Sequence, residues 1–161
     1  MPAVADTPTV ISSQGQWMTP EAAYHWHTRQ ITSWVEKDLP ANLPALVYTR
    51  IGSSALQRLN DFRRWPAGWN NGGGDEIAWS TLQNFESFLE QAHFRTANPP
   101  SLFLTNAGHL ELVWDAHDGR EINVTFTPSG ASYFLAATGE DGEVSARQLG
   151  EFAARVAEMT I

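Results

Sequence analysis

The sequence predicts an α+β fold, an antiparallel meander of about four strands with helices packed on one face. Three observations predict it. The first half of the 161-residue chain places apolar residues at helical spacing, whereas two later segments alternate apolar and polar residues. Short turn signals separate these segments, and sequential strands joined by short turns pair antiparallel. We expect an N-terminal arm over residues 1–18 and a single α+β domain over 19–161.

The first helix is expected to begin at residues 19–21, Thr-Pro-Glu. Threonine caps helices, proline fits the first helical position and glutamate favours the positive end. The helix should run to about Asp38, because Pro40 limits any extension. Residues 46–51 fit either a short strand or a continuing helix, and both interpretations stay open.

Two further helices follow in the first half. One should be capped by Ser53 or Ser54 and stop at Arg64, and the next should begin with a capping box of Ser80 and Gln83. The Asn-Pro-Pro sequence at 98–100 should end the helical half. The apolar positions at helical spacing are Leu56, Leu59, Phe62, Leu82, Phe85, Phe88, Leu89 and Ala92.

The strands are expected at residues 102–104, 110–115, 122–126 and 133–137. The two middle segments alternate with period two, as a half-buried strand does. Asp118-Gly119 predicts the hairpin between them, and Pro128-Ser129-Gly130 predicts the next turn. The expected buried face carries Leu110, Leu112, Trp114, Ile122, Val124 and Phe126.

The last helix has a clear start in the sequence. Ser145 and Gln148 form a capping box, and Val144 with Leu149 forms a hydrophobic staple. The stripe expected to be buried is Leu149, Phe152, Ala153, Val156 and Met159.

Composition and charge exclude several classes of function. The chain has no cysteine, which excludes disulfides, thiolate metal sites and cysteine nucleophiles. A formal charge of −8 disfavours direct nucleic-acid binding, because phosphate affinity needs clustered Lys and Arg. The N-terminal residues lack the pattern of a signal peptide, and no run is long and apolar enough to span a membrane. A cytoplasmic protein that meets a basic surface is the expectation.

The segment 65–76 is the candidate binding site. Two tryptophans precede a turn of asparagines and three successive glycines, and two carboxylates follow. Tryptophan and arginine dominate interface energetics, and glycine lets another backbone or a ligand approach closely. The segment is therefore either a structural corner or a recognition surface. The candidate binding residues are Arg64, Trp65, Trp69, Asn70, Asn71, Gly72, Gly73, Gly74, Asp75 and Glu76.

No catalytic or cofactor signature accompanies this segment. A P-loop needs a lysine after its glycines, whereas Asp75 and Glu76 follow here. The dinucleotide spacing is absent, and a calcium loop needs more oxygen ligands at alternate positions. His25 and His27 would point apart on a helix, and Glu111 with Asp115 fits a polar strand face. We expect no metal and no cofactor, and an enzyme is the less favoured class.

Three segments resemble a group of small bacterial proteins. They are residues 68–74, Gly-Trp-Asn-Asn-Gly-Gly-Gly, residues 108–114, Gly-His-Leu-Glu-Leu-Val-Trp, and residues 122–130, which end in Pro-Ser-Gly. The group carries a Gly-Trp-Asp-Gly-Tyr-Gly-Ala-like motif, a helix and a Leu-Glu-Trp strand. This chain lacks the motif tyrosine and has Asn70 where aspartate is usual. The resemblance carries over no catalytic residue. Because such proteins are often encoded in mobile or accessory gene neighbourhoods, it implies a defence, counter-defence, antitoxin or immunity role.

Three hypotheses of function follow. The first is a small acidic protein that binds another protein, most concretely as an inhibitor, antitoxin or immunity factor. The second is a small-molecule-binding module or small enzyme that uses the glycine-rich loop. The third is a structural subunit of a phage or a homo-oligomeric assembly. A clustered acidic face favours the first, and a concave pocket lined by Trp69 and Asp75 favours the second.

Overall fold

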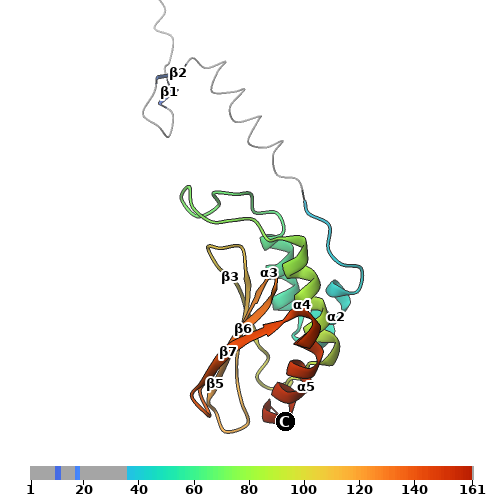
Figure 1. Ribbon diagram of the computed structural model, residues 1–161. Coiled ribbons are helices and arrows are strands. Elements are labelled where there is room, and N and C mark those ends of the chain that lie inside the picture. Colours follow the sequence, from blue (N-terminus) through green and yellow to red (C-terminus); the bar gives the residue numbers. More distant parts are fainter. Residues whose placement is uncertain (1–9, 12–16, 19–35, 161) are drawn as a thin grey trace, which may run out of the picture. The chain divides into compact units, whose positions relative to one another are not determined.

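The structure is a computed structural model that describes residues 10–11, 17–18 and 36–160 (Figure 1). The chain divides into two compact units, residues 1–35 and 36–161. In the first unit, β1 (Val10–Ile11) pairs antiparallel with β2 (Trp17–Met18). Most of the predicted arm and of the helix predicted to end at Asp38 lies outside the described residues. The end of that helix is wrong, because residues 36–38 are not helical.

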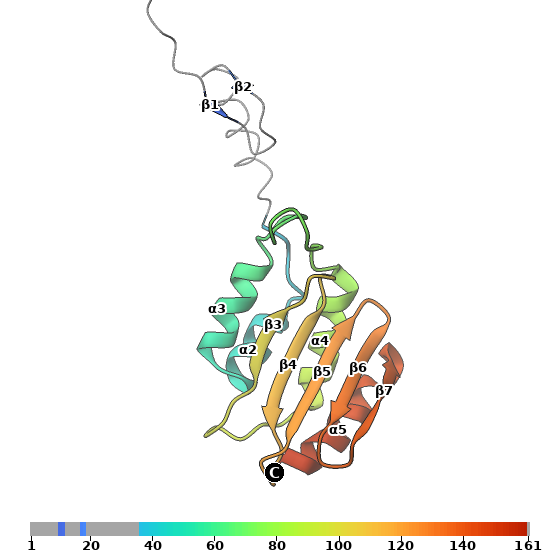
Figure 2. The same ribbon diagram turned by 90° about the vertical axis from the view of Figure 1, so that its left-hand side faces the viewer.

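The second unit is α+β, as predicted, with a five-stranded antiparallel meander in the order β3-β4-β5-β6-β7. The helices are α2 (Leu43–Arg50), α3 (Ser53–Phe62), α4 (Trp79–Gln91), the 3-10 turn η1 (Ala146–Gln148) and α5 (Leu149–Thr160). The strands are β3 (Ser101–Leu104), β4 (Leu110–Asp115), β5 (Glu121–Thr127), β6 (Gly130–Leu135) and β7 (Glu140–Ser145). In the view of Figure 2, α4 and α5 lie behind the sheet and α3 lies beside its β3 edge.

The sequence prediction missed β7. Its residues, Glu-Asp-Gly-Glu-Val-Ser, include one apolar side chain, so the alternation that marks a half-buried strand is absent. The strand lies at the edge of the sheet, where charged residues discourage pairing with another chain. β6 also begins earlier than predicted, at Gly130. A Cβ at this position would lie 2.0 Å from the carbonyl oxygen of Val144, so only glycine fits between the strands.

The helix starts follow the predictions in part. Residues 46–51 were open between strand and helix. Residues 46–50 belong to α2, which has Pro44 in its first turn, and Ile51 is its C-cap. The serine cap predicted for α3 is wrong, because its N-cap is Gly52 and no side chain caps it. The capping box predicted for Ser80 and Gln83 is also wrong, because α4 begins at Trp79 and has no side-chain cap. The capping box of Ser145 and Gln148 is confirmed, and it opens a 3-10 turn that leads into α5.

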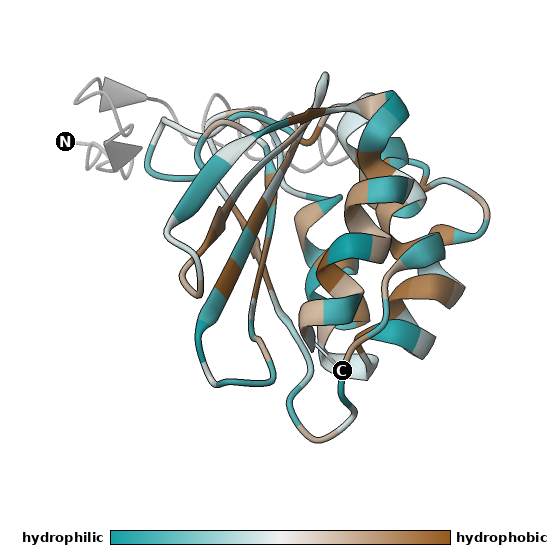
Figure 3. Ribbon diagram, turned by 60° about the horizontal axis from the view of Figure 1, so that its bottom comes forward, coloured by the Kyte–Doolittle hydropathy of each residue, from teal (hydrophilic) through white to brown (hydrophobic). Residues whose placement is uncertain are grey.

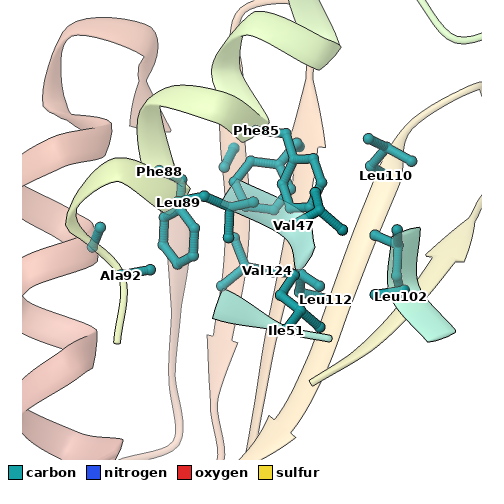
Figure 4. Packing of buried hydrophobic residues seen from close by; sticks show 14 of the residues in the cluster. Val47, Ile51, Phe85, Phe88, Leu89, Ala92, Leu102, Leu110, Leu112 and Val124 are labelled. Carbon is teal, nitrogen blue, oxygen red and sulfur yellow. The ribbon is translucent and has the colours of Figure 1, made fainter. Parts of the chain in front are cut away.

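The core lies between the sheet and the helices (Figure 4). The six predicted positions on β4 and β5 are buried, none more than 4% exposed. The rings of Phe85 and Phe88 on α4 each lie 5.1 Å from the ring of Phe126 on β5. Trp114 contacts Phe88 and Phe94, and its indole N–H donates to the Thr160 hydroxyl at 3.1 Å. This packing holds one face of the sheet against α4 and α5. The opposite face consists of the strand residues that alternate with the buried ones.

Candidate functional site

The glycine-rich loop closes on itself as a small hairpin. The amide of Gly68 donates to the carbonyl of Gly74 at 2.7 Å. Inside that bond, Asn70 and Gly73 exchange two backbone hydrogen bonds, at 2.8 and 2.9 Å. These bonds satisfy most of the polar backbone groups that a ligand would otherwise meet. The loop is therefore an ordered structure rather than an open cradle.

The two tryptophans pack this hairpin against the core. The ring of Trp65 lies 5.1 Å from that of Phe62, and the ring of Trp69 lies 4.6 Å from that of Trp65. Both tryptophans are half-buried, and the Trp69 indole N–H donates to the carbonyl of Asp75 at 3.1 Å. A Cβ at Gly74 would lie 2.6 Å from Trp69 Nε1, so this glycine makes room for the indole.

The far side of the loop binds the turn between β3 and β4. The Asn70 side-chain amide donates to the Asn106 side-chain oxygen at 2.8 Å, and the Asp75 amide donates to the Asn106 carbonyl at 2.8 Å. A Cβ at Gly108 would lie 2.4 Å from the Glu76 carbonyl oxygen. The contacts of Asn106 and Gly108 with the loop were not predictable from the sequence, because no local pattern marks a turn as the partner of a distant loop.

Two charged residues of the candidate site, Arg64 and Glu76, form ion pairs. Glu76 lies 2.5 Å from Lys37 Nζ and accepts the amide of Ala67 at 3.2 Å, and the hydrogen bond from Lys37 lowers the Glu76 pKa from its ordinary value of 4.5. Arg64 pairs with Glu36 at 3.3 Å. An ion-paired carboxylate with a lowered pKa remains charged at neutral pH, which does not suit a general acid.

The structure thus brings the ten predicted binding residues together at one corner. Exposed groups remain at the tip, at Asn71, Gly72, Gly73 and Asp75, and Asn71 takes a left-handed backbone conformation with φ 52°. The geometry explains the loop as a structural corner. Its role in binding stays a prediction.

The open face of the sheet is acidic. Directly paired residues in an antiparallel sheet share a face, so the register places the residues between the buried positions together on the opposite side. Five carboxylates stand there, and we name this surface the acidic face: Glu111, Asp115, Glu121, Asp141 and Glu143. Figure 3 shows hydrophilic and hydrophobic residues alternating along the strands.

No lysine or arginine occurs within the five strands. The acidic face also carries two large apolar side chains, Phe103 at 41% exposure and Phe134 at 44%. Glu111 accepts a hydrogen bond from the Asn123 side-chain amide at 2.7 Å. This bond orients the carboxylate, and the neutral amide leaves its negative charge in place. The polar face of β4 was predictable from its alternating residues. Asp141 and Glu143 could not be assigned to the same face, because β7, the strand that carries them, was not predicted.

A charged cluster ties the far edge of the sheet to α5. The Tyr133 hydroxyl donates to Glu140 at 2.8 Å, and Arg155 pairs with the other Glu140 oxygen at 2.5 Å. The Glu140 carboxylate raises the pKa of Tyr133, and Arg155 lowers that of Glu140. A tyrosine with a raised pKa stays protonated at neutral pH, so its hydroxyl is not an activated nucleophile. The cluster instead connects the edge of the sheet to α5.

Comparison of the chain with known protein families, with curated proteins and with solved structures found no match.

Within the part of the chain that the structure describes, no helix is long and apolar enough to cross a membrane. The same residues contain no group of three His, Asp or Glu side chains arranged to hold a metal ion.

Proposed function

We propose that this protein binds another protein through its acidic face, and that the partner presents a basic surface. One observation carries the proposal: five carboxylates and two exposed phenylalanines share a sheet face whose strands contain no basic residue. An inhibitor, antitoxin or immunity factor is the most concrete form of such a protein. The resemblance to small proteins of mobile gene neighbourhoods supports the same role.

The mechanism is electrostatic steering followed by apolar contact. Clustered like charges raise the association rate with an oppositely charged partner, and the effect weakens as salt screens it. Phe134 supplies an anchor that can enter a pocket of the partner, and Phe103, on which Arg58 stacks, adds apolar contact at the β3 edge. Adjacent strands lie about 4.8 Å apart, and a six-residue strand is about 20 Å long. The face therefore measures about 20 Å by 20 Å, and the contact must extend onto the flanking hairpins to reach a standard interface of about 800 Å² per partner.

The alternatives fit the described geometry less well. A second copy of the chain on this face would oppose five carboxylates with five more, and like charges across an interface repel. The glycine-rich loop satisfies its own hydrogen bonds and buries its tryptophan rings against each other, which leaves a substrate few contacts. Two clefts, of about 520 and 700 Å³, lie elsewhere, and neither is lined by a residue of the loop.

The test removes charge from the face without changing its shape. The variant Glu111→Gln/Glu143→Gln and the control Glu90→Gln/Glu158→Gln each remove two charges, and the control positions are exposed on α4 and α5. Each protein is used to isolate partners from the source cells, with quantification by mass spectrometry at low and high salt. We expect a basic partner that the sheet variant loses and the control retains. Equal recovery by both variants would contradict the proposal.

A further inference from the structure

A cleft of about 520 Å³ lies where α2 ends, α3 begins and β3 starts. Its volume is in the range of small-molecule sites, about 300–1,000 Å³. Three arginines line it, Arg50, Arg58 and Arg95, and no aspartate or glutamate does. In a chain with 18 acidic and 10 basic residues, this is an unusual concentration of positive charge. No residue of the glycine-rich loop lines this cleft.

Two of the arginines are held in place by backbone carbonyl groups. Arg58 donates to the Leu102 carbonyl at 3.0 Å and stacks 5.3 Å from the Phe103 ring. Arg50 donates to the Glu90 carbonyl at 3.4 Å. Within the described residues, neither forms an ion pair with a carboxylate. A guanidinium has five N–H donors, so each arginine keeps its full charge and further donors after these bonds.

The start of α3 adds donors to the same cleft. Its N-cap is Gly52, which has no side chain to cap the first turn, and the hydroxyl groups of Ser53 and Ser54 stand beside it. The first N–H groups of a helix have no partner inside the helix. A Cβ at Gly52 would meet nothing within 4 Å, so the space above this turn is open. The negative end of the α2 dipole, about half a charge, disfavours an anion here, but the two full charges of Arg50 and Arg58 outweigh it.

We propose that this cleft binds the phosphate group of a phosphorylated small molecule. Arginine recognises phosphate by paired N–H···O bonds, and serine hydroxyls with helix N–H groups complete such a shell. The ring of Tyr48, 59% exposed, forms part of the wall and offers a flat surface to a base or a sugar. The site adjoins the acidic face at β3, where Arg58 stacks on Phe103, but none of the five carboxylates of that face lines it. Phosphate binding and binding of a protein partner are therefore measured separately.

The test uses a variant that adds negative charge to the cleft without destabilising α3. Ser54→Glu places a carboxylate at the second position of α3, where the helix dipole favours it and a bound phosphate is repelled. Ser80→Glu places the same charge at the second position of α4 and is the matched control. The full chain is titrated with inorganic phosphate, ribose 5-phosphate and AMP at constant ionic strength, and the amide signals are followed by NMR.

We expect saturable shifts at Ser53 and Ser54, an affinity at least about tenfold weaker in Ser54→Glu, and little change in Ser80→Glu. Arg58→Gln should weaken binding similarly, whereas Arg147→Gln, an exposed arginine outside the cleft, should not. If AMP binds more tightly than ribose 5-phosphate and inorganic phosphate, the ligand is a nucleotide. If the three bind equally, the phosphate alone is the recognised group. Unsaturated or dispersed shifts in the parent protein overturn the proposal. So does tighter binding of a polyglutamate peptide, which would make the occupant an acidic protein segment.

Discussion

Replacing Trp69 with alanine tests whether the glycine-rich loop is a structural corner. In the structure the Trp69 ring stacks on Trp65 and its N–H donates to Asp75. An aromatic pair contributes about 0.5–1.5 kcal/mol and a hydrogen bond about 0.5–1.5 kcal/mol net. Together with the lost burial, Trp69→Ala should lower the free energy of unfolding by about 2–3 kcal/mol. Urea denaturation measures this as a lower midpoint at an unchanged slope.

The matched control is Trp79→Ala. Trp79 begins α4 and is 48% exposed, so its removal should change the free energy of unfolding by less than about 1 kcal/mol. Stability of Trp69→Ala within about 0.5 kcal/mol of the parent protein would refute the structural account of the loop. If that stable variant also lost at least about 2 kcal/mol of partner binding, Trp69 would be an interface anchor instead.

Three further predictions concern the core, the loop backbone and its ion pair. Trp114→Ala should cost about 3–5 kcal/mol in chemical denaturation, because its buried ring contacts two aromatic rings, and a loss below about 1 kcal/mol would place it outside the core. Gly74→Ala should destabilise more than Gly72→Ala, since both have φ near +90° but only the first would contact an indole; equal losses in thermal melting would contradict this. The lowered pKa of Glu76 means that its pair with Lys37 stabilises the fold fully above pH 4.5 and less as pH falls through the folded pKa. Both partners are partly exposed, so the effect is at most about 1 kcal/mol, and an NMR titration midpoint of Glu76 that Lys37→Gln left unmoved would count against the pair.

The fold class and the core of β4 and β5 were predictable because their residues alternate with period two. Leu112 and Val124 are buried partners in the register, as the pattern requires. The edge strand β7 was not predictable in this way, because its acidic residues, such as Asp141, leave it without an apolar face. The Ser80–Gln83 pattern failed for a different reason: Ser-x-x-Gln also occurs inside helices, and the N-cap of α4 is Ala78, two residues before Ser80.

The candidate sites were predictable only where their residues are close in sequence. Trp65 and Trp69 were assigned to one candidate site because they flank a short loop, and their rings are in contact in the structure. The acidic face is formed only when β6 pairs with β7. The arginine-lined cleft combines three arginines from a stretch of sequence in which the first, Arg50, and the last, Arg95, are 45 positions apart. Local spacing carries no information on contacts of that kind, because tertiary packing alone creates them.

Site-specific photo-crosslinking tests the acidic face most directly. A photoreactive residue at Ser132, in the middle strands of the sheet face, is compared with one at Glu158 on the exposed side of α5 and one at Asn71 at the loop tip. The proposal predicts a crosslinked partner with a basic surface from Ser132 alone, lost at high salt and in Phe134→Ser. Crosslinks formed from Glu158 or Asn71 but not from Ser132 would contradict it.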